Sequence, residues 1–482
     1  MSLKEQTLKG LRWSFIDSFS VQAITFIVGV ILARMIEPAE FGLLGYTYFF
    51  VAILSFMVDG GFEAAIIRKK DCTAADYNTS FFFNLGMGVV LYALLFLTAP
   101  FISGFFEEPR LTAILRTVGL MLIICSVGNT PNVRLSKKMD FKTKAIISIG
   151  SSISAGVIAI VMAFHEWGVW CLVWRMVLGA IFSSATVWLF SDWRPAVEFS
   201  RKSFKELFSF GYKVFLSDFV SIIYSNIYYP VIGKFFSATI LGFYTRAENF
   251  STLISNTLSI NVQRVAYPSL ATIQDNIEQL KWNYRKLAKS IMLITFSCML
   301  GMAAVAQPLI SILIGDKWLP CVPFLQLMCG SAMFMPLHHM IRDLLVIRGH
   351  PEIYLRLEII SKSLSVPLIV IGIFWGIEAM LIGKILMSVL VFFMDAHYAS
   401  QMVSYTVREQ LSDIAPLLLV PLCVSLTVWG ITFLHWNNWL TIIVQFLTGC
   451  VLTAVCYEFF KHPNYLEMKE IFMNMAKKLK NE

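Results

Sequence analysis

Two arginines inside long apolar runs are the residues of this sequence best suited to bind a phosphate. Ionisable side chains in such runs are costly, so they face a water-filled cavity or pair with one another. A guanidinium can donate in parallel to two phosphate oxygens. Arg175 and Arg246 are therefore candidates for an anion-binding cavity. A structural ion pair with Asp17, Asp218 or Glu248 is the equally weighted alternative.

A pair of neighbouring histidines marks a second candidate site. His338 and His339 lie on the same apolar run as Arg342 and Asp343. Histidine titrates near physiological pH, so the group could relay protons; a purely hydrogen-bonded structural role is the alternative. The candidates for coupling or ion pairing are Asp17, Asp218, Glu248, His338, His339, Arg342 and Asp343.

The sequence carries no motif for nucleotide hydrolysis, covalent catalysis or metal binding. It has no G-x-S-x-G, no P-loop, no ATP-binding cassette signature and no metal-ligand spacing. We therefore expect no catalytic residue, no metal and no cofactor. Basic runs such as Arg68-Lys69-Lys70 are interpreted as topology signals near anionic lipid, and nucleic-acid binding is not expected.

The composition of the chain indicates that transmembrane helices position these residues. Hydrophobic residues make up 57% of the 482 residues and charged residues 15%, against about 25% charged in a soluble domain. A transmembrane helix needs about 20 apolar residues. We predict an all-α polytopic membrane protein with about 14 transmembrane helices. The predicted spans are 11–33, 41–60, 78–102, 113–134, 143–164, 168–190, 207–232, 239–262, 284–306, 322–346, 353–375, 378–401, 413–434 and 438–459.

The distribution of lysine and arginine tests this layout independently. With the N-terminus inside, the loops assigned to the cytoplasm and the two termini carry about 28 basic residues, and the opposite loops carry about five. One missed span would destroy the asymmetry. We expect a multi-pass protein of a bacterial inner membrane with both termini in the cytoplasm.

An internal repeat divides the chain into two lobes. The segment from Gly10 to Asp17 matches the segment from Gly211 to Asp218 in its glycine, basic and acidic positions. Arg34 and Lys234 then precede matching glycines at equal separations, and we add both as candidates for substrate binding. Six helices per unit make the repeats parallel, with a central cavity between them. The predicted domains are 1–195 and 196–405, each of six helices, and 406–482, with two further helices and a basic tail.

Several ordered blocks of sequence resemble a known exporter family. Ile31-Leu-Ala-Arg34-Met-Ile-Glu-Pro38-Ala-Glu-Phe41-Gly42 is similar to the R-x-L-x-P-x-x-[FY]-G segment of bacterial polysaccharide exporters, with Ile36 in place of Leu. The segments 61–71, 135–141, 232–247, 314–318 and 348–350 also fit. Together they resemble the polysaccharide transporter branch of the multidrug/oligosaccharidyl-lipid/polysaccharide exporter superfamily, of the colanic-acid and O-antigen flippase type.

The resemblance implies a function and a set of partners. It implies alternating access between two six-helix lobes, with undecaprenyl-pyrophosphate-linked oligosaccharide repeat units as cargo for surface polysaccharide biosynthesis. The expected partners are the lipid-linked oligosaccharide, membrane lipids, and a polysaccharide polymerase and glycosyltransferases. The two last helices resemble those of the lipid II flippase. Two alternatives stay open: a cation-coupled multidrug exporter of the same superfamily, and a membrane-embedded polysaccharide polymerase or ligase.

Overall fold

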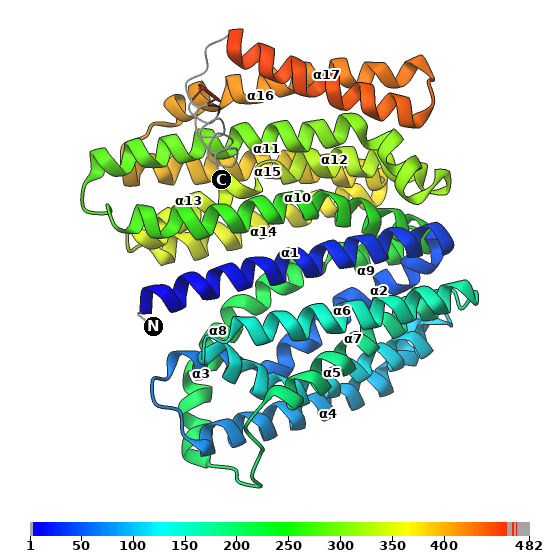
Figure 1. Ribbon diagram of the computed structural model, residues 1–482, viewed down its shortest axis with the longest axis vertical. Helices are drawn as coiled ribbons and strands as arrows, with labels where there is room; N and C mark the ends of the chain where they lie inside the picture. The colour runs from blue at the N-terminus through cyan, green and yellow to red at the C-terminus, as the bar shows by residue number, and fades with distance from the viewer. Residues whose placement is uncertain (1–2, 460–464, 467–468, 470–482) are drawn as a thin grey trace, which may run out of the picture. The chain divides into compact units, whose positions relative to one another are not determined.

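The protein is an assembly of long helices. The computed structural model describes residues 3–459, 465, 466 and 469, and these residues form α-helices and two short 3-10 helices with no β-strand among them (Figure 1). The helices are α1 (Leu3–Met35), α2 (Pro38–Asp59), α3 (Phe62–Arg68), α4 (Ala74–Phe106), α5 (Leu111–Lys137), α6 (Phe141–Phe164), α7 (Val169–Phe190), α8 (Arg201–Asn226), α9 (Tyr228–Phe235), α10 (Ala238–Ala271), α11 (Ile277–Ile314), η1 (Asp316–Cys321), α12 (Val322–Ala332), α13 (Met335–Ile347), α14 (Pro351–Trp375), α15 (Ile377–Val403), α16 (Val407–Gly430), η2 (Ile431–Leu434) and α17 (Asn438–Phe459).

The helices confirm the predicted polytopic membrane fold. Thirteen helical segments within the described residues are long and apolar enough to cross a membrane. The predicted span 239–262 corresponds to α10, which is too polar to be among those thirteen but has 34 residues. At 1.5 Å per residue a helix of that length extends about 50 Å, enough to cross a bilayer. The total of about 14 is consistent with the structure.

Two of the predicted single spans are broken helices. The span 207–232 is divided at Ile227 between α8 and α9, and the span 322–346 is divided at Met333 and Phe334 between α12 and α13. Pro336 occupies the first turn of α13, where its missing N–H leaves no hydrogen bond unmade. Apolarity alone does not distinguish two abutting helices from one.

The first compact unit comprises residues 1–242. Within it α4 packs on α5, α1 on α6, and α7 on both α5 and α6. The helices α8 and α9 pack on α2 and α4, and α8 also packs on α3. Glycine makes the closest of these approaches possible. A Cβ on Gly61, whose φ is +81°, would lie 2.2 Å from the carbonyl oxygen of Gly211, so only glycine fits there.

The second compact unit comprises residues 243–482. Its central helix is α11, which packs on α12, α13, α15, α16 and α17, while α14 packs on α15. The predicted lobes 1–195 and 196–405 and the terminal segment 406–482 are defined by the sequence repeat and stay a prediction. The compact units follow contacts instead, and α8 and α9 belong to the first because they pack on α2 and α4.

Candidate functional site

Arg175 projects from α7 in the first unit and is half-buried. Its Nη2 donates to the carbonyl oxygen of Thr25 on α1 over 3.5 Å, a long hydrogen bond. Within the described part of the chain it has no carboxylate within ion-pair distance. A half-buried guanidinium with one weak carbonyl contact keeps most of its five N–H donors for another acceptor.

Arg246 lies on α10 at the start of the second unit. The Cζ of its half-buried guanidinium is 6.0 Å from the centroid of the Trp318 ring, at the limit of a cation–π contact. Glu248 is half-buried on the same helix and accepts a hydrogen bond from the Tyr244 hydroxyl over 3.3 Å. The structure therefore places Arg246 against an aromatic ring rather than in solvent.

Lys234 and Arg34 have different surroundings in the first unit. Lys234 ends α9 and donates to the carbonyl oxygen of Phe105 over 2.6 Å and to Glu107 over 2.9 Å. This ammonium holds the pKa of Glu107 below its ordinary value. Arg34 is exposed in the last turn of α1. Lys234 thus joins the end of α9 to the end of α4.

The two acids of the repeat are not equivalent. Asp17 is half-buried on α1, hydrogen-bonded to Ser148 of α6 and close to Lys144, with its Oδ1 buried and without a hydrogen-bond partner. Asp218 is exposed on α8. Asp17 is therefore held by α6, and neither acid is an ion-pair partner of Arg175.

A polar cluster lies among three apolar helices of the second unit. His338 donates or accepts through Nδ1 at 2.9 Å from Asp395, and its Nε2 is 3.4 Å from the Ser388 hydroxyl. Arg342 forms an ion pair with Glu358, which Lys362 also contacts over 2.9 Å. We call these residues of α13, α14 and α15 the His338 cluster: His338, Arg342, Glu358, Lys362, Ser388 and Asp395.

Asp395 is the acid on which this cluster converges. It is fully buried, and Arg342 Nε lies 3.9 Å from the carboxylate oxygen that contacts His338. Its other oxygen has no hydrogen-bond partner. Tyr284 of α11 also lies within electrostatic range of this carboxylate. A buried charge is tolerated only when it is paired, so His338 and Arg342 together compensate Asp395.

The remaining members of the predicted coupling group lie beside the cluster. His339 is half-buried, with Arg342, Glu358 and Asp395 in electrostatic range, and Asp343 is half-buried on the same helix. Sequence reasoning missed Glu358 as a site residue. Its signal was available, because Glu358 and Lys362 are four residues apart and hence neighbours on one helical face.

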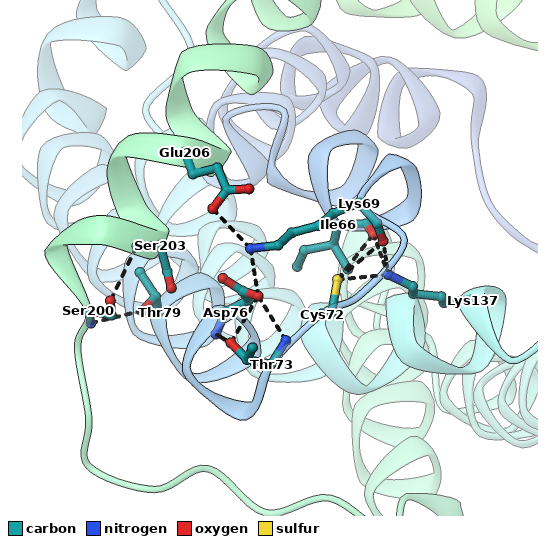
Figure 2. A network of polar contacts seen from close by, with 10 residues as sticks. All are labelled: Ile66, Lys69, Cys72, Thr73, Asp76, Thr79, Lys137, Ser200, Ser203 and Glu206. Carbon is teal, nitrogen blue, oxygen red and sulfur yellow. Dashed lines mark hydrogen bonds and ion pairs between the residues drawn. The ribbon is translucent and has the colours of Figure 1, made fainter.

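A second network joins α3, α4 and α8 at one end of the first unit. Figure 2 shows Lys69 between two carboxylates, 2.9 Å from Asp76 and 3.0 Å from Glu206. Burial alone would lower the pKa of the Lys69 ammonium, but the hydrogen bonds to these two acids outweigh burial and raise that pKa. Lys137 donates to the carbonyl oxygens of Ile66 and Lys69, which closes the end of α3.

The same network fixes the starts of α4 and α8. Thr73 and Asp76 form a reciprocal capping box at the start of α4. The Ser200 amide, at the start of α8, donates to the Thr79 hydroxyl over 3.0 Å. Lys69, interpreted from sequence as a topology signal, therefore also holds three helices together.

Comparisons with known proteins agree with this architecture. The family model described as "Polysaccharide biosynthesis protein" matches residues 31–323. The lipopolysaccharide biosynthesis protein WzxC of Escherichia coli is 27% identical over 378 residues, which cover 77% of this chain and 76% of that protein.

Two solved structures share the fold. The lipid II flippase MurJ in an inward closed conformation has a TM-score of 0.76 at 14% identity, covering 93% of this chain and 99% of its own. An inward-facing multidrug resistance MATE family transporter of the MOP superfamily has a TM-score of 0.60 at 14% identity, covering 81% and 98%. The chain is thus a multi-pass membrane protein with the fold of these transporters, and it belongs to the polysaccharide biosynthesis protein family.

Proposed function

We propose that this chain is a flippase that moves undecaprenyl-pyrophosphate-linked oligosaccharide repeat units across the cytoplasmic membrane by alternating access. The observation that carries the proposal is membership of the polysaccharide biosynthesis family over residues 31–323. WzxC is named for lipopolysaccharide biosynthesis, and the fold shared with MurJ and the MATE transporter is one on which transport operates. The product would serve surface polysaccharide biosynthesis.

The same proposal assigns a membrane and an orientation. We place the chain in a bacterial inner membrane with both termini in the cytoplasm, since about 28 basic residues lie on that side against about five on the other. The polymerase and glycosyltransferases that use or build the repeat unit are the expected protein partners. A lipid-linked substrate requires that the protein accept both an anionic headgroup and an apolar chain.

Arg175 is the residue we assign to the pyrophosphate. Its guanidinium lacks a carboxylate partner within the described part of the chain, and its contact with Thr25 is weak. Arg246, Arg34 and Lys234 remain candidates for the same role. Lys234 is less suited than Arg175, because its ammonium already contacts Glu107 and the Phe105 carbonyl.

The His338 cluster is the group we assign to coupling. It holds an imidazole between a buried carboxylate and a hydroxyl, on three helices of the second unit. The cations Arg342 and Lys362 and the acids Glu358 and Asp395 surround this imidazole, so a proton gained or lost by the cluster changes its net charge. In a low-dielectric site such a change of charge alters the electrostatic energy strongly, and can therefore favour one packing arrangement of the helices over another.

A cation-coupled multidrug exporter is the alternative function. A cavity for cationic drugs favours unpaired acids. Two buried acids of the second unit are paired instead, Asp395 with His338 and Asp413 with Arg285, and Arg175 of the first unit is a cation. The membrane polymerase or ligase is not carried forward, because the fold is shared with a flippase and a drug transporter.

Export in living cells tests the proposal. In a bacterium whose genome encodes this chain, deletion of the gene should make lipid-linked repeat units accumulate on the cytoplasmic side and surface glycan disappear. Plasmid-borne wild-type protein should restore both. Surface glycan at the normal level in the deletion strain, with no accumulated precursor, would overturn the flippase assignment, whereas raised sensitivity to cationic dyes alone would favour the drug exporter.

A further inference from the structure

A basic pocket lies where the beginning of α1 meets the turn between α5 and α6. The pocket has a volume of about 280 Å³. We call it the α1–α6 pocket, and the lining residues that matter here are Lys9, Trp13, Lys138, Asp140, Phe141 and Lys142. It belongs neither to the Arg175 region nor to the network of Figure 2.

The pocket is shaped by the packing of α1 on Phe141. A Cβ on Gly10 would lie 2.8 Å from a ring carbon of Phe141, so the glycine lets α1 approach this ring closely. Trp13 follows one turn later, and the Lys142 ammonium lies 5.9 Å from the centroid of its ring. The rings of Trp13 and Phe141 thus line the same pocket as the lysines.

The charge of the pocket is predominantly positive. Three lysines and one acid, Asp140, line it. This carboxylate already accepts hydrogen bonds from the amide and hydroxyl of Thr143, at 3.1 and 2.7 Å, as the cap of α6. Lys138 contacts Asp192 over 3.2 Å, but both side chains are more than half exposed, and such surface pairs contribute only about 0–1 kcal/mol. The lysines therefore lack a strong acidic partner inside the pocket.

The pocket lies at the level of lipid headgroups. The spanning segment Arg12–Met35 begins here, Leu111–Lys137 ends here and Phe141–Phe164 begins here. On α6 the face that carries Lys142 continues with exposed Ile146, Ile153 and Val157, at helical spacings. An anion-binding site next to an apolar stripe suits an amphiphile, whereas a soluble phosphate would make no contact with the stripe.

We propose that the α1–α6 pocket binds the diphosphate headgroup of a polyprenyl lipid before translocation, an assignment that rests on the proposed flippase function and its orientation. Ammonium groups bind phosphate oxygens as point charges. An excess of two positive charges matches a diphosphate better than the single charge of a bilayer phosphodiester. Pockets for drug-sized ligands have volumes of about 300–1,000 Å³. A pocket of 280 Å³ lies just below that range, so it can hold a diphosphate headgroup but not the attached sugars as well.

Binding to the purified full-length chain tests the assignment. The protein is placed in nanodiscs of zwitterionic phosphatidylcholine, and the Kd of undecaprenyl diphosphate is measured for wild type and for K9Q/K138Q/K142Q. The matched control is K70Q/K202Q/K205Q, which removes three exposed lysines outside the pocket. We expect a Kd at least tenfold higher for the pocket variant and an unchanged Kd for the control. Equal weakening of both variants would overturn the pocket in favour of general surface charge.

Two competing lipids distinguish the source of the phosphate. Undecaprenyl monophosphate and phosphatidylglycerol are each titrated against bound undecaprenyl diphosphate. We expect both to compete at least tenfold more weakly than the diphosphate. Competition by phosphatidylglycerol at equal concentration would make this a site for bilayer lipid, and equal competition by the monophosphate would remove the diphosphate assignment.

Export separates failure of this inference from failure of the proposed function. Each variant is first shown to have the wild-type unfolding temperature. Export reduced in the pocket variant and normal in the control supports a loading site. Normal export by the pocket variant overturns the inference and leaves the flippase function intact, whereas a wild-type chain that exports no glycan overturns the flippase function itself.

Discussion

At the scale of single residues, the distinction that matters is between charges that already have a partner and charges that do not. Lys69, Lys234 and Arg342 each contact a carboxylate, so they stabilise the fold. Arg175 has only a long hydrogen bond to a backbone carbonyl, with no carboxylate near it in the part of the chain that the structure describes. We therefore keep the proposal that Arg175 binds an anion in preference to the structural ion pair, an alternative that the sequence alone left equally weighted.

Replacing Arg175 with alanine should impair export without unfolding the protein. Hydrogen bonds to charged groups contribute about 1.5–3 kcal/mol, which corresponds to a loss of export of roughly ten- to a hundredfold. Arg116 is the matched control, because it also donates to a backbone carbonyl, that of Phe96, and lies 4.0 Å from that ring. Surface glycan per unit of expressed protein is the measurement. Equal export by R175A and R116A would show that Arg175 does not bind the substrate.

His338 should be the residue that makes transport respond to protons. H338Q keeps a hydrogen-bonding side chain next to Asp395 and Ser388 but removes the titratable group. We expect proteoliposomes with H338Q to transport at a rate independent of an imposed pH gradient, whereas wild type responds to it. His397, exposed on α15 beside Gln401, provides the control H397Q. A gradient response in H338Q equal to that of wild type would exclude the coupling role.

At the scale of elements, the two C-terminal helices are attached to α11 by charge as well as by packing. Asp413, near the start of α16, contacts Arg285 and Lys289 of α11 and accepts a hydrogen bond from Tyr405 over 2.6 Å. Glu409 contacts Lys281 one turn earlier. Because α16 in turn packs on α17, this group of contacts holds one end of the terminal pair.

D413N should therefore loosen α16 and α17. Removing one member of a buried ion pair costs about 3–5 kcal/mol, and partial exposure of Arg285 lowers that value. We expect a lower unfolding temperature in detergent and faster proteolysis of the segment after Val403. The control is E458Q, which removes an exposed pair with Lys469. Identical unfolding temperatures for the two variants would mean that apolar packing alone anchors the pair.

The elements that sequence predicted well are those decided by apolarity. Each predicted span corresponds to a long apolar run. The helix α10 is comparatively polar, but its apolar residues from 239 onward were sufficient to predict a span there. The breaks at Ile227 and Met333 were missed, although a proline follows each by three residues, Pro230 and Pro336, and proline favours the first turn of a helix over its interior. The seven-residue helix α3 is too short to leave a periodic signal.

At the scale of the whole molecule, sequence predicted the fold class and the family but only part of the candidate site. His338 and Arg342 were identified because ionisable residues stand out in an apolar helix, and the structure brings both to one cluster. Their partners Asp395 and Glu358 lie on other helices, and pairing between helices depends on packing that one sequence does not specify. The α1–α6 pocket likewise needs the contact of Gly10 with Phe141, 131 positions later in the chain.

Translocation by the purified chain is the most direct test of the central claim. Proteoliposomes that carry an undecaprenyl-diphosphate-linked oligosaccharide with a cleavable fluorescent sugar are incubated with an impermeant glycosidase, and the fraction of substrate made accessible is measured over time. We predict that wild-type protein moves most of the inner-leaflet substrate to the outside, while R175A protein moves it at least tenfold more slowly. Accessible substrate that stays at the level of protein-free liposomes, under imposed gradients of either direction, would contradict the account.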